Sequence, residues 1–464
     1  MNQFIYNANP SRVLFGSGTS ARLAEEISAM GCSRALILST PQQADLAEKT
    51  CIDIGPLATG VFTEAAMHTP VAVTCEALKS AEQTAADCLV PVGGGSTIGL
   101  SKAIALRSGL PQIAIPTTYA GSEMTPILGQ TEDGVKTTQR TMKVLPEVVI
   151  YDVDLTLTLP IDLSVTSGIN AMAHAIEALY AENRNPVISM LAEEGIRALY
   201  RTLGIISNNP SDIEVRSDAL FGAWLCGTSL GSVGMALHHK LCHTLGGTFD
   251  LPHAETHTVL LPHVTAFNAV AVPELDALGH KLNGTSLAVS IAELAKRAGA
   301  PLSLAAIGMP KDGLDRAAEL AVSNPYFNPR KFSQDDIREL LGCIRTSCAR
   351  DEREMTEPIL VVTNLTKRFG GFVALDEVDV SLGGKERLGL IGPNGSGKTT
   401  LINCISGALF NEQGKVNFEG SDVTGTTASN RAKLGIVRTF QIPRPFRSMT
   451  IIENLEIPMK YAAS

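Results

Sequence analysis

Short runs of apolar, often β-branched residues alternate with longer segments of helical periodicity over the first 160 residues. Four of these runs are predicted strands, at 34–39, 88–92, 113–116 and 148–151. Strands that alternate with helical segments are typical of a parallel sheet with helices on its faces. The pattern therefore predicts an α/β domain over residues 1–160.

The pattern changes twice further along the chain. From residue 161 to about 345 apolar positions recur at helical spacing, so we expect an all-α domain there. Strand-like runs return beyond the charged stretch at 350–354, at 358–362, 372–375, 378–382 and 388–391. Because 464 residues exceed what one core usually organises, we predict three domains. Their bounds are 1–160, 161–345 and 355–464, with a linker at 346–354.

Composition narrows the possible functions. A formal net charge of -9 argues against a nucleic-acid partner, which requires a concentrated positive surface. Nine cysteines without regular spacing indicate reduced thiols rather than a disulfide framework. The start of the chain lacks a signal-peptide pattern, and no apolar stretch is long enough to span a bilayer. We therefore expect a cytoplasmic protein with no insertion into a membrane.

A glycine-rich turn follows the predicted strand at 88–92 and leads into a helical segment at 100–106. Glycines let a backbone approach a phosphate closely, and a helix N-terminus favours negative charge. We expect this turn to bind the pyrophosphate of a dinucleotide, with the candidates Gly93, Gly94, Gly95, Ser96 and Thr97. A tight turn without a ligand is the alternative, because the spacing differs from G-x-G-x-x-G.

A second loop at 115–124 also follows a predicted strand, and its side chains could close over the same phosphates or the nicotinamide ribose. Its candidates are Thr117, Thr118, Tyr119 and Ser122. Residues 39–42, after the strand at 34–39, read Ser-Thr-Pro-Gln, and Ser39 is a further candidate. A strict NAD enzyme has a carboxylate here for the adenosine 2'-hydroxyl. Because none is present, we expect use of both NADH and NADPH.

Histidines gather on two predicted helices. On the helix at 168–181, Asn170, His174 and Glu177 form a polar stripe opposite the apolar face. A second helix at 235–245 places His239, Lys240 and His243 on one side, and His253 follows it. His238 points with the apolar face and is predicted to be a core histidine. Each of the others has the same structural alternative, but together they indicate a cluster for a divalent metal or for proton transfer.

These motifs together resemble the iron-containing alcohol dehydrogenase superfamily, across nearly all of residues 1–345. The resemblance implies a dinucleotide-binding α/β domain and an all-α catalytic domain, the dehydroquinate synthase-like fold. It also implies a metal site for Fe2+ or Zn2+ at Asn170, His174, His239 and His253. Most members have Asp at the first of these positions. Asn170 removes a negative charge, so we expect weaker metal binding.

Within that superfamily, Asn170, Tyr119, the run at 238–243 and the run at 324–330 resemble maleylacetate reductases more than simple alcohol dehydrogenases. The resemblance implies reduction of the carbon–carbon double bond of maleylacetate, a keto-diacid, to give 3-oxoadipate in the degradation of aromatic compounds. It also implies a homodimer. A metal-dependent alcohol or polyol dehydrogenase on the same scaffold is the alternative.

Hydride addition to an enone builds negative charge on the ketone oxygen and leaves a carbon that must gain a proton. We assign His243 as the leading proton donor, with His253 beside it, and Lys240 or protonated His243 as the group that stabilises the oxygen. The predicted partners of the two substrate carboxylates are Lys240, Thr118, Tyr326 and either Lys136 or Arg140, with 131–143 as a loop.

The third domain carries a complete P-loop after an apolar run. Backbone amides of such a loop bind phosphates, its Lys reaches the terminal ones, and its Thr binds Mg2+. With Gln441, this segment resembles the ATP-binding cassette of branched-chain amino-acid importers. No signature or Walker B sequence follows, so we expect ATP binding without hydrolysis; a transport ATPase with a passenger domain is the alternative. The predicted ATP-binding residues are Gly392, Asn394, Gly395, Gly397, Lys398, Thr399, Thr400 and Gln441.

Overall fold

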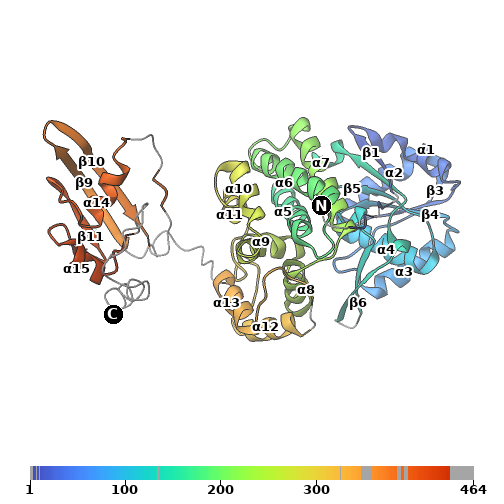
Figure 1. Cartoon of the computed structure of the whole chain (residues 1–464). Helices are drawn as coiled ribbons and strands as arrows, with labels where there is room; N and C mark the ends of the chain where they lie inside the picture. The colour runs from blue at the N-terminus through green and yellow to red at the C-terminus, as the bar shows by residue number, and fades with distance from the viewer. Residues whose placement is uncertain are drawn as a thin grey trace. The chain divides into compact units, whose positions relative to one another are not determined.

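The structure is a computed structural model of the chain (Figure 1). It describes residues 4–6, 8–9, 11–132, 135–323, 326–345, 358–383, 388–390 and 395–438. The chain forms two compact units, residues 1–349 and 350–464. Each unit is described by itself. The predicted linker at 346–354 lies outside the described residues.

A six-stranded parallel sheet organises the first part of the larger unit. Its order is β1-β8-β5-β4-β2-β3. Every residue of the inner strands β2, β4, β5 and β8 is buried, which explains their continuous apolar runs. The bounds are β1 Arg12–Gly16, β2 Ala35–Leu38, β3 Ala58–Phe62, β4 Cys88–Gly93, β5 Ile113–Pro116 and β8 Val148–Asp152.

Helices cover both faces of this sheet, as the side chains of β2 show. Ala35 and Ile37 pack into one core, and Leu36 and Leu38 pack into another. Successive side chains of a strand point to opposite faces, so the two cores lie on opposite sides of the sheet. Helices α1 (Leu23–Ala29) and α2 (Ala44–Ile54) contribute to the first core, and α3 (Val71–Gln83) and α4 (Gly95–Ser108) contribute to the second.

The rest of the larger unit is helical, and its described residues from 161 to 345 contain no strand. Helix α5 is buried along most of its length (Figure 1). The predicted α/β plus all-α fold is thereby confirmed. The helices are α5 Ile161–Tyr180, α6 Pro186–Ile206, α7 Ile213–Ser232, α8 Leu237–Phe249, α9 His253–Ala269, α10 Glu274–Asn283, α11 Leu287–Arg297, α12 Leu314–Val322 and α13 Gln334–Arg345.

None of the described helices is by itself long and apolar enough to cross a membrane, and only the bent pair α7 and α8 meets that criterion when taken together.

The sequence pattern missed four strands of the larger unit. The outer strands β1 and β3 are only partly buried, so they lack a continuous apolar run. The two others, β6 (Ile127–Glu132) and β7 (Val135–Arg140), pair as an antiparallel hairpin. The prediction of a loop at 131–143 was therefore wrong, because the hairpin's partly exposed strands give no apolar signal.

The smaller unit contains a four-stranded antiparallel sheet in the order β10-β9-β11-β12. The predicted runs at 372–375 and 378–382 form one strand, because both belong to β10. Residues 388–390 of the predicted strand at 388–391 are not in a strand. The elements are β9 Leu360–Phe369, β10 Phe372–Leu382, α14 Lys398–Ile405, β11 Gln413–Phe418, β12 Ser421–Asp422 and α15 Ala428–Lys433.

Candidate active site

A pocket of about 1060 Å³ lies where the carboxyl ends of the parallel strands meet the helical half of the larger unit. Loops after β2, β4 and β5 form one part of its wall, and α5, α8 and α9 form another. In an open α/β sheet, ligands bind at this edge. The two groups of candidate residues from the sequence therefore meet in one place.

The glycine turn forms part of the pocket wall. Gly94, Gly95 and Ser96 line the pocket where α4 begins, as expected for a site that binds pyrophosphate. A Cβ atom at Gly94 would lie 2.9 Å from Cγ2 of Thr118, so the two loops meet only because this residue has no side chain. Gly93 and Thr97 do not line the pocket; both are buried, and they pack against each other. Their prediction as cofactor contacts was wrong.

The second loop is divided in the same way. Thr117, Thr118 and Ser122 line the pocket, and Nε2 of Gln43 donates to Oγ1 of Thr117 at 3.0 Å. Tyr119 lies in the core instead, where its hydroxyl accepts a hydrogen bond from Arg216 at 3.2 Å. Its prediction as a cofactor contact was wrong, because its large ring fills the core.

Ser39 is also buried away from the pocket, and its hydroxyl donates to the carbonyl oxygen of Val92 at 3.0 Å. Its prediction as a cofactor contact was wrong. Thr40, Gln42 and Gln43, which come next in the chain, line the pocket and include no carboxylate. The expected use of NADPH rests on the absence of a carboxylate after β2. That absence also holds for these pocket-lining residues, which lie one to four positions after Ser39.

Lys102 is a buried residue that sequence reasoning missed. Its ammonium group donates to the carbonyl oxygens of Ser122 at 2.5 Å, Thr125 at 2.7 Å and Ile127 at 3.0 Å. Burial lowers the pKa of Lys102 to about 7, although nearby Glu123 acts to raise it. These bonds fix the end of the second loop, and a lone Lys within an apolar helix is the signal that could have revealed them.

Imidazoles form the helical part of the pocket wall. His174 and Asn170 come from α5, His239 and His243 from α8, and His253 from the start of α9. Ring centroids are 5.1 Å apart for His174 and His239, 6.1 Å for His239 and His243, and 6.4 Å for His243 and His253. Burial lowers the pKa of His174 well below its ordinary value, and the other histidines lower it further. The structure thus brings together the cluster that the sequence predicted.

These residues do not form the preassembled metal site that the resemblance implied. Oδ1 of Asn170, Nδ1 of His174 and Nε2 of His239 are buried and have no hydrogen-bond partner among the described residues, so they could accept a cation. Yet His174, His239 and His253 are not among the described groups whose metal-binding atoms all lie within 4.8 Å of one another. The set also lacks a carboxylate at Asn170. As placed, it does not fit a tetrahedral or octahedral metal ion.

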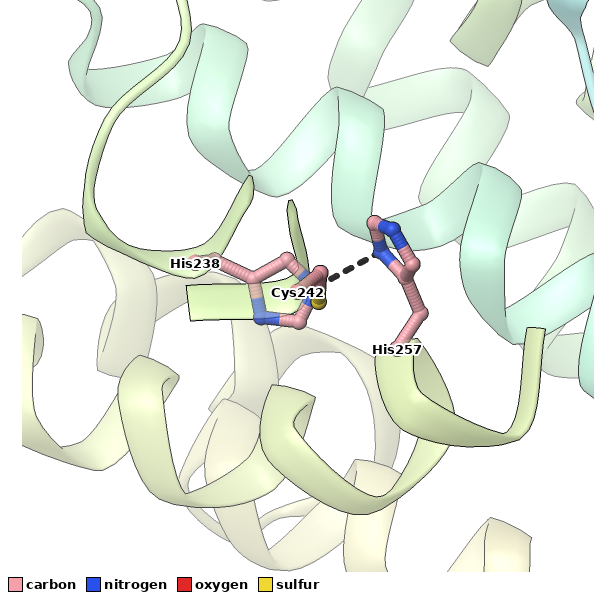
Figure 2. A group of neighbouring side chains, drawn as sticks. All are labelled: His238, Cys242 and His257. Atoms are coloured by element: carbon pink, nitrogen blue, oxygen red, sulfur yellow. Dashed lines mark hydrogen bonds between the residues drawn. The ribbon is translucent and has the colours of Figure 1, made fainter. Parts of the chain in front are cut away.

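A second group of side chains, shown in Figure 2, lies next to these rings but outside the pocket wall. Nε2 of His238 lies 2.9 Å from Nδ1 of His257 and 3.6 Å from Sγ of Cys242. All three residues are buried and none lines the pocket. Burial lowers the pKa of His238 to about 3 and that of His257 well below its ordinary value. His238 is a core histidine, as its place on the apolar face predicted.

Sequence reasoning missed His257. It lies four residues after His253 on α9, so it shares that residue's side of the helix. Its ring centroid is 4.5 Å from that of His253 and 4.9 Å from that of His239. It therefore packs behind two rings of the pocket wall. The i, i+4 spacing was the available signal.

Two of the predicted cations, Lys240 and Arg140, are not among the described residues that line the pocket. Lys240 lies with its ammonium group 5.7 Å from the ring centroid of Tyr326, and neither residue is part of the pocket wall. Nη1 of Arg140 donates to the carbonyl oxygen of Val233 at 3.0 Å, and its Nη2 donates to that of Gly231. Each of these three residues makes a local contact, and their assignment to the substrate stays a prediction. The side chain of Lys136 lies outside the described residues.

The predicted phosphate loop of the smaller unit is described only in part. Helix α14 begins at Lys398 and includes Thr399 and Thr400. Gly395 and Gly397 have φ values of 87° and 86°, a region that favours glycine. Nζ of Lys398 donates to Oγ of Ser396 at 3.2 Å. The candidates Gly392, Asn394 and Gln441 lie outside the described residues.

Comparison with known proteins decides between the families that could have such a pocket. Residues 10–153 match the model of the iron-containing alcohol dehydrogenase family, and residues 164–344 match the model of its C-terminal part. A maleylacetate reductase from Rhizobium sp. (strain MTP-10005) is 58% identical over 341 residues, which are 74% of this chain and 97% of the relative. The chain belongs to the maleylacetate reductase branch of the iron-containing alcohol dehydrogenase family.

Other members of this branch agree. A maleylacetate reductase from Burkholderia cepacia is 55% identical over 342 residues, which are 74% of this chain and 97% of the relative. The crystal structure of a maleylacetate reductase from Agrobacterium tumefaciens is 58% identical, with a TM-score of 0.72, and the match covers 75% of this chain and 99% of that one. The chain is therefore a nicotinamide-dependent oxidoreductase. Beyond this match, residues 375–464 match the ABC transporter family.

Proposed function

We propose that the larger unit reduces the carbon–carbon double bond of maleylacetate with NADH or NADPH and releases 3-oxoadipate. The observation that carries this proposal is that one pocket is lined both by the glycine turn at 94–96 and by five imidazoles, four of them from the helical half. The names of the relatives at 55–58% identity support the substrate. The absence of a carboxylate among Thr40, Gln42 and Gln43 supports the use of both nucleotides.

The reaction adds a hydride and a proton across the double bond. The glycine turn would hold the phosphates of the nicotinamide nucleotide, which would supply a hydride to the carbon distant from the ketone, and the electron pair of the double bond would move toward the ketone oxygen. Hydrogen-bond donors stabilise the resulting enolate. His243 then donates a proton to the carbon beside the ketone, with His253 next to it. The products are NAD(P)+ and a saturated keto-diacid.

The described residues of the pocket wall offer other partners for the substrate carboxylates than the predicted Lys240 and Arg140. Among the described residues that line the pocket there is no Lys or Arg, and Glu255 is the acidic member. Positive charge can therefore come from His243 and His253, and from the N-terminus of α9, where residues 253–255 line the pocket. The first N–H groups of a helix have no partner within it and favour an anion. Thr118 supplies a hydroxyl group in the same pocket.

An assay of the full chain tests this function. We expect maleylacetate to oxidise NADH and NADPH in a 1:1 ratio of substrate to nucleotide, with 3-oxoadipate as the product found by mass spectrometry. A chelator should leave the rate unchanged. Failure with maleylacetate, together with chelator-sensitive oxidation of simple alcohols, would favour the metal-dependent alcohol dehydrogenase instead. Light scattering of the same preparation tests the expected homodimer.

For the smaller unit we propose binding of ATP with Mg2+ at the P-loop. The positive φ values of Gly395 and Gly397, and Lys398 at the start of α14, support this site. Calorimetry of the full chain should show ATP binding that Lys398→Ala removes while the reductase rate stays the same. We expect no hydrolysis of ATP, and release of phosphate above background would favour a transport ATPase.

A further inference from the structure

Two cysteines lie close together at the amino-terminal edge of the parallel sheet. Cys88 is the first residue of β4 and pairs with Ala35, the first residue of β2. Cys32 precedes Ala35 by three positions, and its Sγ lies 3.7 Å from the carbonyl oxygen of Asp87. The metal-binding atoms of Cys32, Asp87 and Cys88 all lie within 4.8 Å of one another. The segments before β2 and β4 thus bring two thiols and a carboxylate together.

This group lies at the other end of β4 from the pocket, and none of its three residues lines the pocket. Within the part of the chain that the structure describes, the other group with metal-binding atoms this close is that of His238, Cys242 and His257. That group has one thiol, and all of its members are buried. The group at the sheet edge has two thiols, and its members Cys32 and Asp87 are partly exposed. It therefore combines two soft ligands with access from solvent.

The carboxylate of Asp87 is oriented by the residues that follow Cys32. One oxygen accepts a hydrogen bond from the backbone N–H of Arg34 at 2.8 Å. The other accepts from the backbone N–H of Ser33 at 2.9 Å and from its hydroxyl at 3.1 Å. Burial acts to raise the pKa of Asp87, but the hydrogen bonds outweigh it, so the pKa lies below its ordinary value. The carboxylate is therefore ionised and held in place, as metal-binding carboxylates are by their outer hydrogen bonds.

Negative charge surrounds both thiols. Burial raises the pKa of Cys32, and the charges of Asp87 and Glu147 act in the same direction. Burial also raises the pKa of Cys88, and interactions with Cys32 and Asp87 raise it further. The same carboxylates that disfavour a bare thiolate attract a dication, and a dication deprotonates the thiols that bind it. The charges around the two sulfurs therefore favour a bound cation.

We propose that Cys32, Cys88 and Asp87 form a binding site for a thiophilic divalent cation such as Zn2+, with water as the fourth ligand. Thiolates favour Zn2+ over Mg2+ and Ca2+, which prefer oxygen ligands. A tetrahedral Zn2+ with bonds of about 2.3 Å to sulfur places its two sulfurs about 3.8 Å apart, within the 4.8 Å of this group. Binding exchanges the two thiol protons, which are released to solvent, for one cation. The site joins the segments before β2 and β4, and it does not rest on the proposed reductase function.

Titration of the reduced full chain with Cd2+ alone, a thiophilic probe for Zn2+, tests the site. Cadmium–thiolate bonds give an ultraviolet charge-transfer band, which Cd2+ bound to imidazole or carboxylate lacks. We expect this band to saturate at one Cd2+ per chain. Cys32→Ser should lower the affinity more than about 100-fold, since loss of a group that merely orients a ligand costs about 10- to 100-fold. Absence of the band in the wild-type protein, or an equal band in Cys32→Ser, would overturn the proposal.

Cys51→Ser is the matched control, because Cys51 packs, like Cys32, partly buried against the core that contains Cys88 but lies in neither described group of metal-binding atoms. We expect it to keep the wild-type band. A band that Cys242→Ala removes and Cys32→Ser keeps would place the cation beside His238 and contradict the proposal. X-ray absorption of the wild-type chain with one Zn2+ per chain requires no variant to fold. It should show two sulfur neighbours at about 2.3 Å, and nitrogen and oxygen neighbours alone would overturn the site.

Discussion

Helix α8 carries imidazoles on two adjacent faces, and the two faces differ in what the rings contact. On the pocket face, His239 and His243 line a cavity beside the glycine turn. On the core face, His238 contacts His257 and Cys242 at hydrogen-bond distance and lines no cavity (Figure 2). The same residue type thus serves two purposes at neighbouring positions of one helix. A neighbouring cavity, rather than the residue type, distinguishes a candidate catalytic histidine from a structural one.

The largest effect is expected from removing a ring of the pocket face. His243→Ala should lower kcat about 100-fold or more, because the enolate carbon loses its proton donor. Steady-state kinetics with maleylacetate and NADH measures this, and circular dichroism should show an unchanged fold. A variant with nearly wild-type turnover would remove His243 from the mechanism.

A carboxylate added to the pocket face should change its affinity for metals. Asn170→Asp restores the residue that most of the superfamily has at this position, and a buried carboxylate adds the negative charge that a dication requires. We expect affinity for Zn2+ or Fe2+ to rise about 10- to 100-fold. Isothermal titration calorimetry with the metal alone measures this affinity. Equal affinity in both proteins would mean that the imidazoles, rather than residue 170, limit metal binding.

A side chain placed at the glycine turn should weaken nucleotide binding. Gly94→Val puts a Cβ atom 2.9 Å from Cγ2 of Thr118, so the Thr118 side chain or one of the two loops must shift. Overpacking of this kind costs about 1–3 kcal/mol, which predicts a rise in KM for NADH of about 10-fold or more. Gly342→Val is a control for a glycine substitution on α13, remote from the pocket, where no atom lies within 4 Å of the added Cβ. An unchanged KM in Gly94→Val would exclude the turn from nucleotide binding.

A substitution on the core face should change the stability of the protein rather than its turnover. Cys242→Ala removes a thiol that lies 3.6 Å from His238, and we expect it to lower the free energy of unfolding by about 1–3 kcal/mol. Its kcat should stay near that of the wild type. Denaturant unfolding and the NADH assay on the same sample measure both quantities. A large loss of kcat with unchanged stability would assign Cys242 to catalysis and erase the difference between the faces.

The smallest expected effect is on how the free energy of unfolding depends on pH. Burial lowers the pKa of His238 to about 3, below the ordinary value of about 6.5 for an unfolded chain. Between these values the unfolded state binds a proton that the folded state excludes, so the free energy of unfolding falls as the pH falls. For one group the slope is about 1.4 kcal/mol per pH unit. His238→Gln should reduce the slope by about this amount; an equal slope in both proteins would contradict the buried, neutral state of His238.

The sequence predicted the fold best where burial is complete. The inner strands β2, β4, β5 and β8 are buried at every position and gave clear apolar runs. The outer strands β1 and β3 are partly exposed, and the pattern missed them. Prediction of the site was also incomplete. Motif spacing identified His174, His239, His243 and His253, but it could not tell which neighbours face the pocket.

Tyr119 and Lys240 show why the sequence could not tell which side chains face the pocket. Each lies next to a residue of the pocket wall in the sequence, and only packing decides that Tyr119 bonds Arg216 while Lys240 lies near the ring of Tyr326. Contacts between distant segments caused the same difficulty for Glu177, whose carboxylate accepts hydrogen bonds from the start of α8, some 60 residues away. Local periodicity contains no information about such contacts.

Transfer of deuterium from NADH labelled at its reactive C4 position tests the central claim most directly. The account predicts 3-oxoadipate with one deuterium on the carbon that had been in the double bond and lay distant from the ketone, and with a solvent proton on its neighbour. Deuterium found instead on a newly formed carbinol carbon would show that the enzyme reduces the carbonyl group, and that result would contradict the account.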